Sequence, residues 1–253
     1  MSQDASGDFY FQHKGHCPAC DKDVTFQADG PQFRGTLKCS ACKSVPRTRA
    51  FMHVIETMFA NWRDLTIHEG SPGWDMVSQR LVRDCKSYTA SQFVLGAQSG
   101  TVQTTRMPCK TLQVEDLERQ TFKDESFDLV LTQDVFEHVF RPDLAIREIA
   151  RTLKPGGATV MTVPIVRRHR PSRRRARLND GEVIHLEPPE YHANPVSSDG
   201  SLVTVDWGFD IVSYFQFHSG LSFMMLQIDN IDLGIRAELN EVLVGFKRDV
   251  PEL

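Results

Sequence analysis

Four cysteines near the beginning of the chain have the spacing of metal ligands. They form two Cys-x-x-Cys pairs, Cys17 with Cys20 and Cys39 with Cys42. Pairs separated by about twenty residues are typical of a tetrahedral zinc site, in which four thiolates leave no open position for water or substrate. The sequence therefore predicts one structural Zn²⁺ ion. Two structural disulfides are the alternative, and the lack of a secretory signal in the polar start of the chain argues against them.

Three histidines are candidates for a general base, because imidazole titrates near neutral pH. His138 follows Glu137 directly, and His185 and His192 lie in a long polar segment further along the chain. The alternative for His138 is a capping or packing role. The alternative for the other two is a solvated loop.

The long polar segment, residues 166–200, also carries a dense positive patch. It contains seven arginines between Arg167 and Arg177. Such a patch predicts an anionic acceptor, such as a phosphate, sugar nucleotide, carboxylate or RNA backbone. The alternative is a mobile, solvated charge run, or one that pairs with acidic neighbours such as Asp180, Glu182 and Glu187.

Length and composition limit the class of protein. A chain of 253 residues holds one medium α/β domain and a small appendage, and its net charge of −4 argues against a protein that coats nucleic acids. No apolar run approaches the roughly 20 residues of a membrane-spanning helix. We therefore expect a cytoplasmic protein with no membrane partner. Cys85 and Cys109 are expected to be small buried residues, and the sequence leaves the oligomeric state open.

The pattern of apolar residues divides the chain into three parts. Residues 1–45 are expected to form a zinc-ribbon-like module, with a short hairpin at Val24–Phe26 and Gln32–Arg34. Residues 46–63 are expected to form a linking helix, and residues 64–253 the main domain. In the linking helix one face is apolar: Phe51, Val54, Ile55, Met58 and Phe59.

Short β-rich runs alternate with helices from about Leu65, which indicates an α/β fold with a parallel sheet. The clearest helix, Pro142–Leu153, begins at a proline and ends at the stop signal Lys154–Gly157. Seven strands are expected, at Leu65–His68, Ser87–Ser91, Thr111–Val114, Phe127–Thr132, Ala158–Pro164, Ser222–Asp229 and Val242–Lys247.

A glycine-bearing turn, Glu69-Gly70-Ser71-Pro72-Gly73, follows the first of these strands. Such a turn between strand and helix lets backbone amides approach a ligand closely. Further along, other motifs occur in a fixed order: Asp116-Leu117, Phe127-Asp128-Leu129-Val130, Gln133-Asp134, Glu137-His138-Val139 and Lys154-Pro155-Gly156-Gly157.

With these motifs in order, the sequence resembles the class I S-adenosylmethionine-dependent methyltransferases, in particular the methyltransferase type 11 group. The resemblance covers about Leu65 to Pro164. It implies a Rossmann-like, doubly wound, mostly parallel seven-stranded sheet, with residues 166–200 as an insertion on the acceptor side.

The resemblance also implies which residues contact the cofactor. The methionine and ribose side is lined by Glu69, Gly70, Ser71 and Gly73. The adenine side is lined by Asp116 and Leu117, and Gln133 and Asp134 lie beneath the transferred methyl group. Where the family has an acidic residue for the ribose hydroxyls, this chain has Ser91 and Gln92, which are neutral hydrogen-bonding groups.

The expected function is methyl transfer from S-adenosylmethionine to an oxygen or nitrogen of a small-molecule or glycan-type acceptor, with an anionic acceptor favoured by the arginines. An RNA methyltransferase is one alternative. A non-catalytic zinc-binding adaptor with a vestigial methyltransferase fold is the other, because the glycine turn has two glycines where the family has three.

Overall fold

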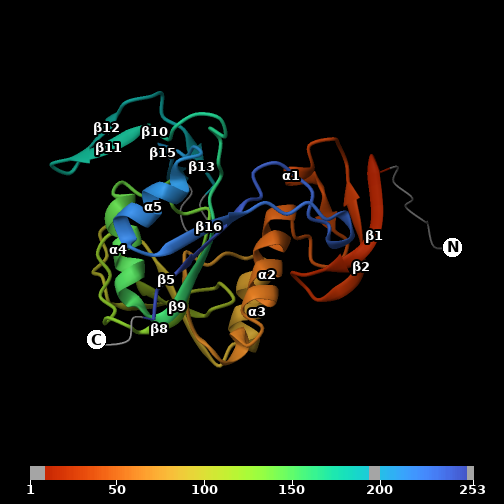
Figure 1. Cartoon of the computed structure of the whole chain (residues 1–253), viewed down its shortest axis with the longest axis horizontal. Coiled ribbons are helices and arrows are strands. Elements are labelled where there is room, and N and C mark those ends of the chain that lie inside the picture. The colour runs from red at the N-terminus through yellow and green to blue at the C-terminus, as the bar shows by residue number, and fades with distance from the viewer. Residues whose placement is uncertain (1–8, 194–199, 250–253) are drawn as a thin grey trace.

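A central sheet of eight strands, with helices on both faces, organises the chain (Figure 1). The computed structural model describes residues 9–193 and 200–249. The strand order across the sheet is β16-β17-β9-β8-β4-β5-β7-β6. These strands are β4 (Thr66–Gly70), β5 (Ser87–Gln92), β6 (Val102–Thr104), β7 (Thr111–Val114), β8 (Phe127–Gln133), β9 (Leu153–Thr162), β16 (Ser222–Leu226) and β17 (Val242–Phe246).

All seven expected strands are present, and the sheet is mostly parallel. Strands β9, β8, β4, β5 and β7 are parallel neighbours, whereas β17 runs antiparallel to both β9 and β16. The expected number of strands is corrected from seven to eight. The added strand, β6, folds back antiparallel on β7 at the edge of the sheet. All three of its residues are exposed, so it lacks the apolar alternation that reveals a strand in a sequence.

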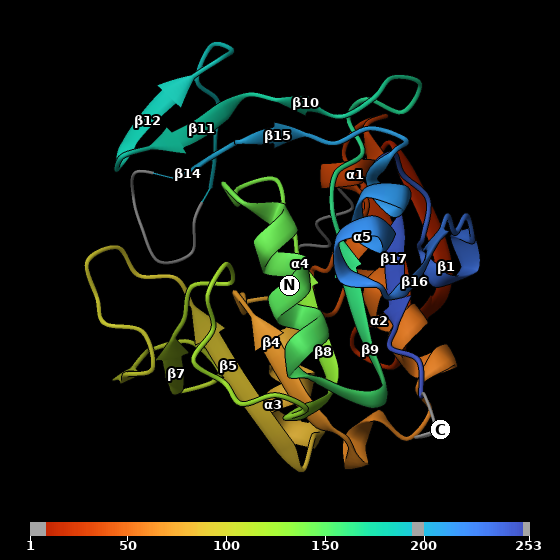
Figure 2. The same ribbon diagram turned by 60° about the vertical axis from the view of Figure 1, so that its left-hand side comes forward.

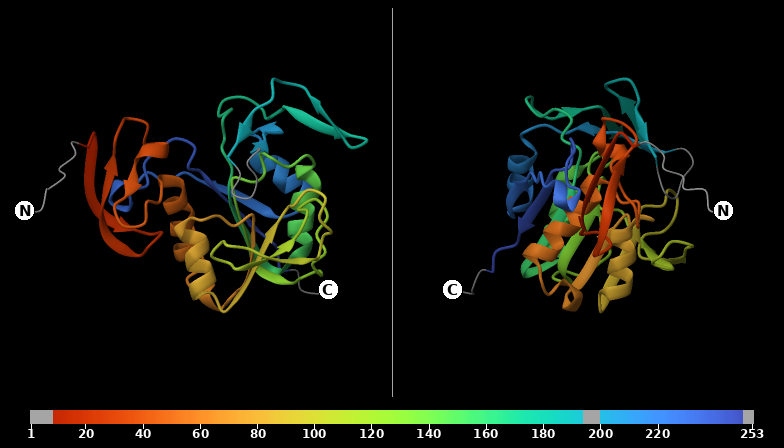
Figure 3. Two further views of the ribbon diagram at one scale, coloured as in Figure 1. Left: turned by 180° about the vertical axis from the view of Figure 1, so that it is seen from behind. Right: turned by 90° about the vertical axis from the view of Figure 1, so that its right-hand side faces the viewer.

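Two apolar cores lie on opposite faces of the sheet, because successive side chains of a strand point to opposite sides. In β8, Leu129 and Leu131 pack with helices α2 and α3, and Val130 packs with helices α4 and α5 on the other face. Figures 2 and 3 show these two pairs of helices on opposite sides of the sheet. The helices are α1 (Phe33–Thr36), α2 (Pro46–Met58), α3 (Met76–Asp84), α4 (Pro142–Thr152) and α5 (Ile211–Ser219), with 3-10 turns η1 (Trp62–Asp64) and η2 (Ile231–Leu233).

The N-terminal segment forms a separate three-stranded antiparallel sheet of β1 (Phe11–Cys17), β2 (Lys22–Ala28) and β3 (Lys38–Cys39). Its hairpin joins β1 to β2 across the first cysteine pair. The expected hairpin is therefore partly wrong, since Val24–Phe26 is in a strand but Gln32–Arg34 enters helix α1.

A buried arginine of α2 joins this small sheet to the rest of the chain. The Arg49 guanidinium donates hydrogen bonds to the carbonyl oxygens of Leu37 (2.9 Å) and Gly234 (2.7 Å), and it lies 4.7 Å from the centre of the Phe26 ring. Gly234 belongs to the loop between β16 and β17. Helix α2 also packs on one face of the central sheet, where its residues Phe51, Val54 and Ile55 are buried. The three-part division of the chain stays a prediction.

The segment after β9 crosses over the loop that follows β8. Its short strands pair as β10 with β15, β11 with β12, and β13 with β14, and the β11–β12 hairpin extends away from the sheet (Figure 2). They are β10 (Arg173–Arg174), β11 (Ala176–Asn179), β12 (Glu182–His185), β13 (Tyr191–His192), β14 (Ser201–Leu202) and β15 (Val205–Asp206). Among the helices of the described ranges, none has the length and apolar character needed to cross a membrane.

Candidate active site and metal-binding residues

The end of β4 presents a buried carboxylate to the first turn of α3. Glu69 accepts hydrogen bonds from the hydroxyls of Ser78 (2.7 Å) and Tyr88 (2.5 Å). Burial, and then the nearby carboxyl of Asp75, raise the pKa of Glu69 to about 7. Asp75 caps α3 by accepting from the backbone amides of Val77 and Ser78, which is the usual function of aspartate at a helix start.

The raised pKa predicts a pH-dependent stability. Folded Glu69 holds its proton up to about pH 7, whereas the unfolded group loses it near pH 4.5. Stability from this group is thus complete below the unfolded pKa and is lost as the pH rises through 7. Between about pH 5.5 and about pH 8 it should fall by about 2 kcal/mol. Urea unfolding of the ligand-free wild type and Glu69→Gln measures this, and equal pH slopes for the two would contradict it.

In the turn after β4, a serine adopts a backbone conformation that is usually reserved for glycine. Ser71 has φ +60°, in the left-handed region that non-glycine residues rarely adopt. Its amide donates to the Ser91 carbonyl (2.8 Å) and its hydroxyl donates to Oε1 of Gln92 (3.0 Å). These bonds hold the strained residue, and they explain how the turn forms with two glycines rather than three.

The two neutral residues at the end of β5 have different surroundings. The Ser91 hydroxyl is buried against Nε2 of His68 (2.8 Å), whose pKa burial lowers to about 3. Ser91 therefore belongs to the core. Gln92 lies at the turn, where its side chain contacts Ser71 and donates weakly to the Phe93 carbonyl (3.4 Å). Of the two, Gln92 is the one whose side chain is directed to the loop of the predicted cofactor site.

The residues predicted for the adenine side follow β7. Asp116 is half-buried, and its Oδ1 accepts from the backbone amide of Glu118 (2.9 Å). Leu117 lies beside Gly70: a Cβ on Gly70 would be 3.6 Å from Leu117 and 3.3 Å from Thr132. The space next to Gly70 is therefore bounded by β8 and by the segment after β7.

Residues at the end of β8 contact strand β9, helix α2 and the N-terminal cap of helix α3. Asp134, with φ +50°, accepts from the Thr162 hydroxyl (2.9 Å) and forms an ion pair with Arg47 of α2 (2.9 Å). Gln133 donates to Oδ2 of Asp75 (3.3 Å). Glu69, Gln92, Asp116 and Gln133 thus follow or end four neighbouring parallel strands, the edge at which open α/β sheets bind ligands.

Two of the three candidate histidines are neighbours, and the third is apart from them. The rings of His138 and His192 are 5.1 Å apart and nearly perpendicular. Nδ1 of His138 bonds to the Leu202 carbonyl (2.9 Å), and burial lowers its pKa. His185 is exposed on β12, and within the described chain no hydrogen bond or ion pair joins it to either of the others.

Beside these histidines lies a buried carboxylate. Glu137 is 2% exposed, and burial, with the negative charge of Asp134, raises its pKa well above the usual value. Its Oε1 lies 3.7 Å from Nε2 of His138 and 3.9 Å from Nδ1 of His192.

The arginines of the insertion are largely used in internal contacts. Arg173 and Arg175 both pair with Asp206 (2.8 and 3.1 Å), and Arg174 donates to the Phe140 carbonyl (2.7 Å). These contacts hold β10 against β15 and against the segment before α4. They favour the alternative in which the arginine run pairs with acidic neighbours.

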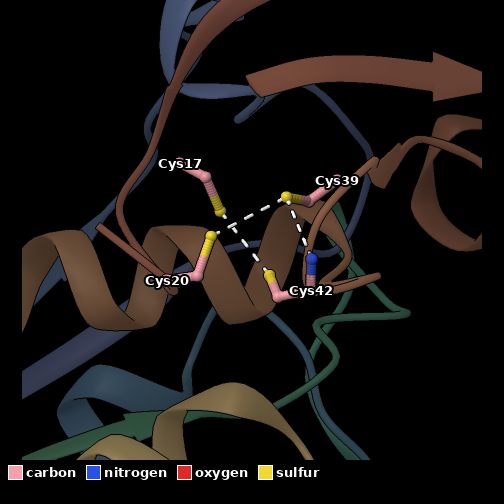
Figure 4. A group of neighbouring side chains, drawn as sticks. All are labelled: Cys17, Cys20, Cys39 and Cys42. Carbon is pink, nitrogen blue, oxygen red and sulfur yellow. Dashed lines mark hydrogen bonds between the residues drawn. The ribbon is translucent and has the colours of Figure 1, made fainter. Parts of the chain in front are cut away.

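The four predicted zinc ligands lie together (Figure 4). Sγ of Cys17 is 3.8 Å from Sγ of Cys42, and Sγ of Cys20 is 3.9 Å from Sγ of Cys39. Sulfurs bound at 2.3 Å to one tetrahedral ion would be about 3.8 Å apart. All six cysteines lie in the described part of the chain and are free thiols. The arrangement fits a four-thiolate metal site and not a pair of disulfides.

Sequence reasoning did not assign Asp75, Arg47 or Glu137 to the site. Asp75 could have been found as a helix cap before Met76. Glu137 belonged to a noted motif, but nothing in the sequence indicates that its carboxylate is buried. Nothing in the sequence around Arg47 indicates a role in the site, because only the tertiary structure brings α2 to the end of β8.

Comparisons with known proteins agree with this architecture. Residues 73–161, from the turn after β4 into β9, match the family model described as a methyltransferase domain. No curated protein matches the sequence. Among solved structures, an S-adenosylmethionine-dependent methyltransferase from Mesorhizobium loti is similar, with 14% identity and a TM-score of 0.51; the match covers 79% of this chain and 98% of that one.

A second similar structure is the 1,6-didemethyltoxoflavin-N1-methyltransferase of Burkholderia thailandensis, with 12% identity and a TM-score of 0.47. The match covers 81% of this chain and 79% of that one. The likeness to the Mesorhizobium loti protein shows the fold, and the family model identifies the domain. The chain therefore contains a match to the methyltransferase domain over residues 73–161 and has the fold of the S-adenosylmethionine-dependent methyltransferases.

Proposed function

We propose that the chain binds S-adenosylmethionine at the carboxyl ends of β4, β5, β7 and β8 and transfers its methyl group to an oxygen or nitrogen of a small acceptor. The observation that carries this proposal is the convergence of the turn after β4, Gln92, Asp116 and Gln133–Asp134 on one edge of the sheet. The bound sulfonium would supply an electrophilic methyl group, so that the protein mainly has to position the acceptor.

An open cavity of about 440 Å³ beside the proposed cofactor site is large enough for a small-molecule or glycan-type acceptor. Small-molecule sites commonly have volumes of roughly 300–1,000 Å³. The cavity adjoins the end of β8, since Arg47 both lines it and pairs with Asp134. Its lining residues are Gln32, Arg34, Gly35, Thr36, Val45 and Arg47.

Two arginines at this cavity favour an acceptor with an anionic group. Burial, followed by the positive charge of Arg47, lowers the pKa of Arg34. Within the described chain Arg34 makes no hydrogen bond or ion pair, so its guanidinium is available to a ligand. A screen of anionic and neutral acceptors, with S-adenosylhomocysteine formation as the readout, tests this. Preferred methylation of structured RNA would contradict it.

The four-cysteine site is proposed to hold one structural Zn²⁺. The donor set supports this, because thiolates select zinc and four of them complete its tetrahedral shell. The free thiols also suit a reducing compartment such as the cytoplasm.

Replacing Gln92 by alanine should weaken cofactor binding. If the Gln92 amide supplies a neutral hydrogen bond to the ribose, Gln92→Ala should raise the Kd for S-adenosylhomocysteine by roughly 3- to 10-fold. Ser91→Ala is the matched control: it removes the buried bond to His68 and should lower stability with little change in Kd. Calorimetric titration of the three proteins measures this. No binding to the wild type, or equal Kd values for wild type and Gln92→Ala, would contradict the assignment.

A further inference from the structure

The carboxylate of Glu137 is buried without a hydrogen-bond donor. The residue is 2% exposed, and within the described chain neither of its oxygens has a hydrogen-bond partner. A buried acceptor without a partner is costly, so native structures rarely leave one without a ligand, a water molecule or an ion.

Two imidazole nitrogens face this carboxylate at distances that suit a shared ion. Nε2 of His138 and Nδ1 of His192 lie 3.7 and 3.9 Å from Oε1 of Glu137, which is too long for a hydrogen bond. The three ligand atoms all lie within 4.8 Å of one another. Two atoms bound to one ion at about 2.1 Å can be up to about 4.2 Å apart, so a small adjustment of the side chains brings all three into coordination.

Of the two outer ring nitrogens, one has a hydrogen-bond partner and the other lies near a carboxylate. Nδ1 of His138 bonds to the Leu202 carbonyl at 2.9 Å, and a carbonyl only accepts, so Nδ1 carries the proton and Nε2 keeps its lone pair toward Glu137. Nε2 of His192 lies 3.6 Å from the Glu190 carboxylate. Outer partners of this kind orient the histidines of metal sites.

The backbone around the cluster is fixed from two sides. Glu137 and His138 follow β8, and the Glu137 carbonyl accepts from the amide of Thr204 at 2.7 Å. His192 belongs to β13, which pairs with Ser201–Leu202 of β14. Strand β13 of the insertion and strand β14 after it therefore place His192 and the Leu202 carbonyl beside Glu137 and His138.

We propose that Glu137, His138 and His192 bind one divalent transition-metal ion, distinct from the zinc at the four cysteines. Two imidazoles and one carboxylate form a donor set that suits Mn²⁺, Fe²⁺, Co²⁺ or Zn²⁺ better than the all-oxygen ligands preferred by Mg²⁺ and Ca²⁺. Three protein ligands leave coordination positions open, in contrast to the closed four-cysteine site.

This position points to an acceptor with a hydroxyl group, an inference that rests on the proposed function. Glu137 is three residues from Asp134, which lies at the proposed methyl-transfer centre. An acceptor hydroxyl bound at the ion has a lowered pKa and releases its proton to water. Its oxygen then forms a bond to the methyl carbon as the carbon–sulfur bond breaks. The electron pair of that bond stays on sulfur, which leaves S-adenosylhomocysteine and the methyl ether.

Uptake of Mn²⁺ by the zinc-loaded protein tests the site. Mn²⁺ binds thiolates weakly and should not displace zinc from the cysteines. Free Mn²⁺ is followed by electron paramagnetic resonance, and the second equivalent of Zn²⁺ by equilibrium dialysis. We expect about one additional ion per chain in the wild type. Glu137→Gln and His192→Ala should each weaken its binding by at least roughly tenfold. His169→Ala, at an exposed histidine of the same insertion, should bind like the wild type.

Two results would overturn the metal site: no uptake of either ion beyond the zinc at the cysteines, or unchanged uptake in both Glu137→Gln and His192→Ala. Circular dichroism of each variant shows whether it is folded, and Glu137→Gln keeps the shape of the side chain. Calorimetry with S-adenosylhomocysteine on the same samples separates the two proposals. Cofactor binding without metal uptake contradicts only the metal site, and metal uptake without cofactor binding contradicts only the proposed methyl transfer.

Discussion

Replacement of Cys39 by serine should release zinc from the chain and unfold its N-terminal sheet. Structural zinc sites supply about 10 kcal/mol or more of binding free energy. That is comparable with the whole stability of a domain. Cys39 is fully buried, and its sulfur accepts a hydrogen bond from the backbone amide of Cys42. A serine hydroxyl is a poor ligand for zinc. Metal analysis and urea unfolding in reducing buffer measure the effect.

The loss of stability in Cys39→Ser should extend beyond the N-terminal sheet. Arg49 connects the Leu37 and Gly234 carbonyls, and Arg80 of α3 donates to the Pro18 carbonyl (2.7 Å) between the first two cysteines. If the cysteine turns unfold, both buried guanidinium groups lose acceptors, at a cost of about 1–3 kcal/mol each. We therefore expect aggregation or a strongly lowered midpoint of unfolding for the whole chain.

Cys85→Ser is the matched control for this prediction. Cys85 lies outside the cluster and its thiol contacts the Leu65 carbonyl (3.3 Å), so a serine can replace it while zinc remains bound. A zinc-free Cys39→Ser protein with wild-type stability would refute a structural role for the ion. A wild type that folds in reducing buffer without any zinc would do the same.

Enlarging Gly70 should weaken cofactor binding in proportion to the size of the new side chain. A Cβ at this position already lies 3.3 Å from the Thr132 methyl and 3.6 Å from Leu117, which is tight but tolerable. The additional methyl groups of valine must displace these neighbours or enter the space proposed for the cofactor. We expect a graded effect on the Kd for S-adenosylhomocysteine, about tenfold for Gly70→Ala and at least about 100-fold for Gly70→Val.

The alanine variant and an unfolding measurement distinguish a blocked site from a misfolded one. Overpacking in a core costs about 1–3 kcal/mol, so Gly70→Val should remain folded but less stable. Gly30→Ala, at a glycine with open space around its Cβ position, serves as the control. It should change neither the Kd for S-adenosylhomocysteine nor the stability. A folded Gly70→Val protein that binds the cofactor with wild-type affinity would exclude this turn from the site.

Local signals in the sequence were sufficient for much of the architecture. The strand over Thr111–Val114 was predicted with its observed bounds, and the helix starting at Pro142 ends within one residue of its predicted end. A proline start, a Lys-Pro-Gly-Gly stop and β-rich runs act over a few residues, so they can be recognised without a partner. The failures were β6, which has no buried residue, and Gln32–Arg34, whose short run does not distinguish a strand from a turn of helix.

The sequence by itself determined the chemical inventory: two cysteine pairs, an ordered set of strand-end motifs and a group of histidines and arginines. Only the tertiary structure decided how this inventory is used. It paired Arg173 and Arg175 with Asp206 and left Arg34 facing a cavity. It also placed His192 beside Glu137 and Arg49 against a carbonyl 185 residues away. The reason is physical: burial and pairing depend on which distant segments pack together, and a side chain's type and local spacing do not contain that information.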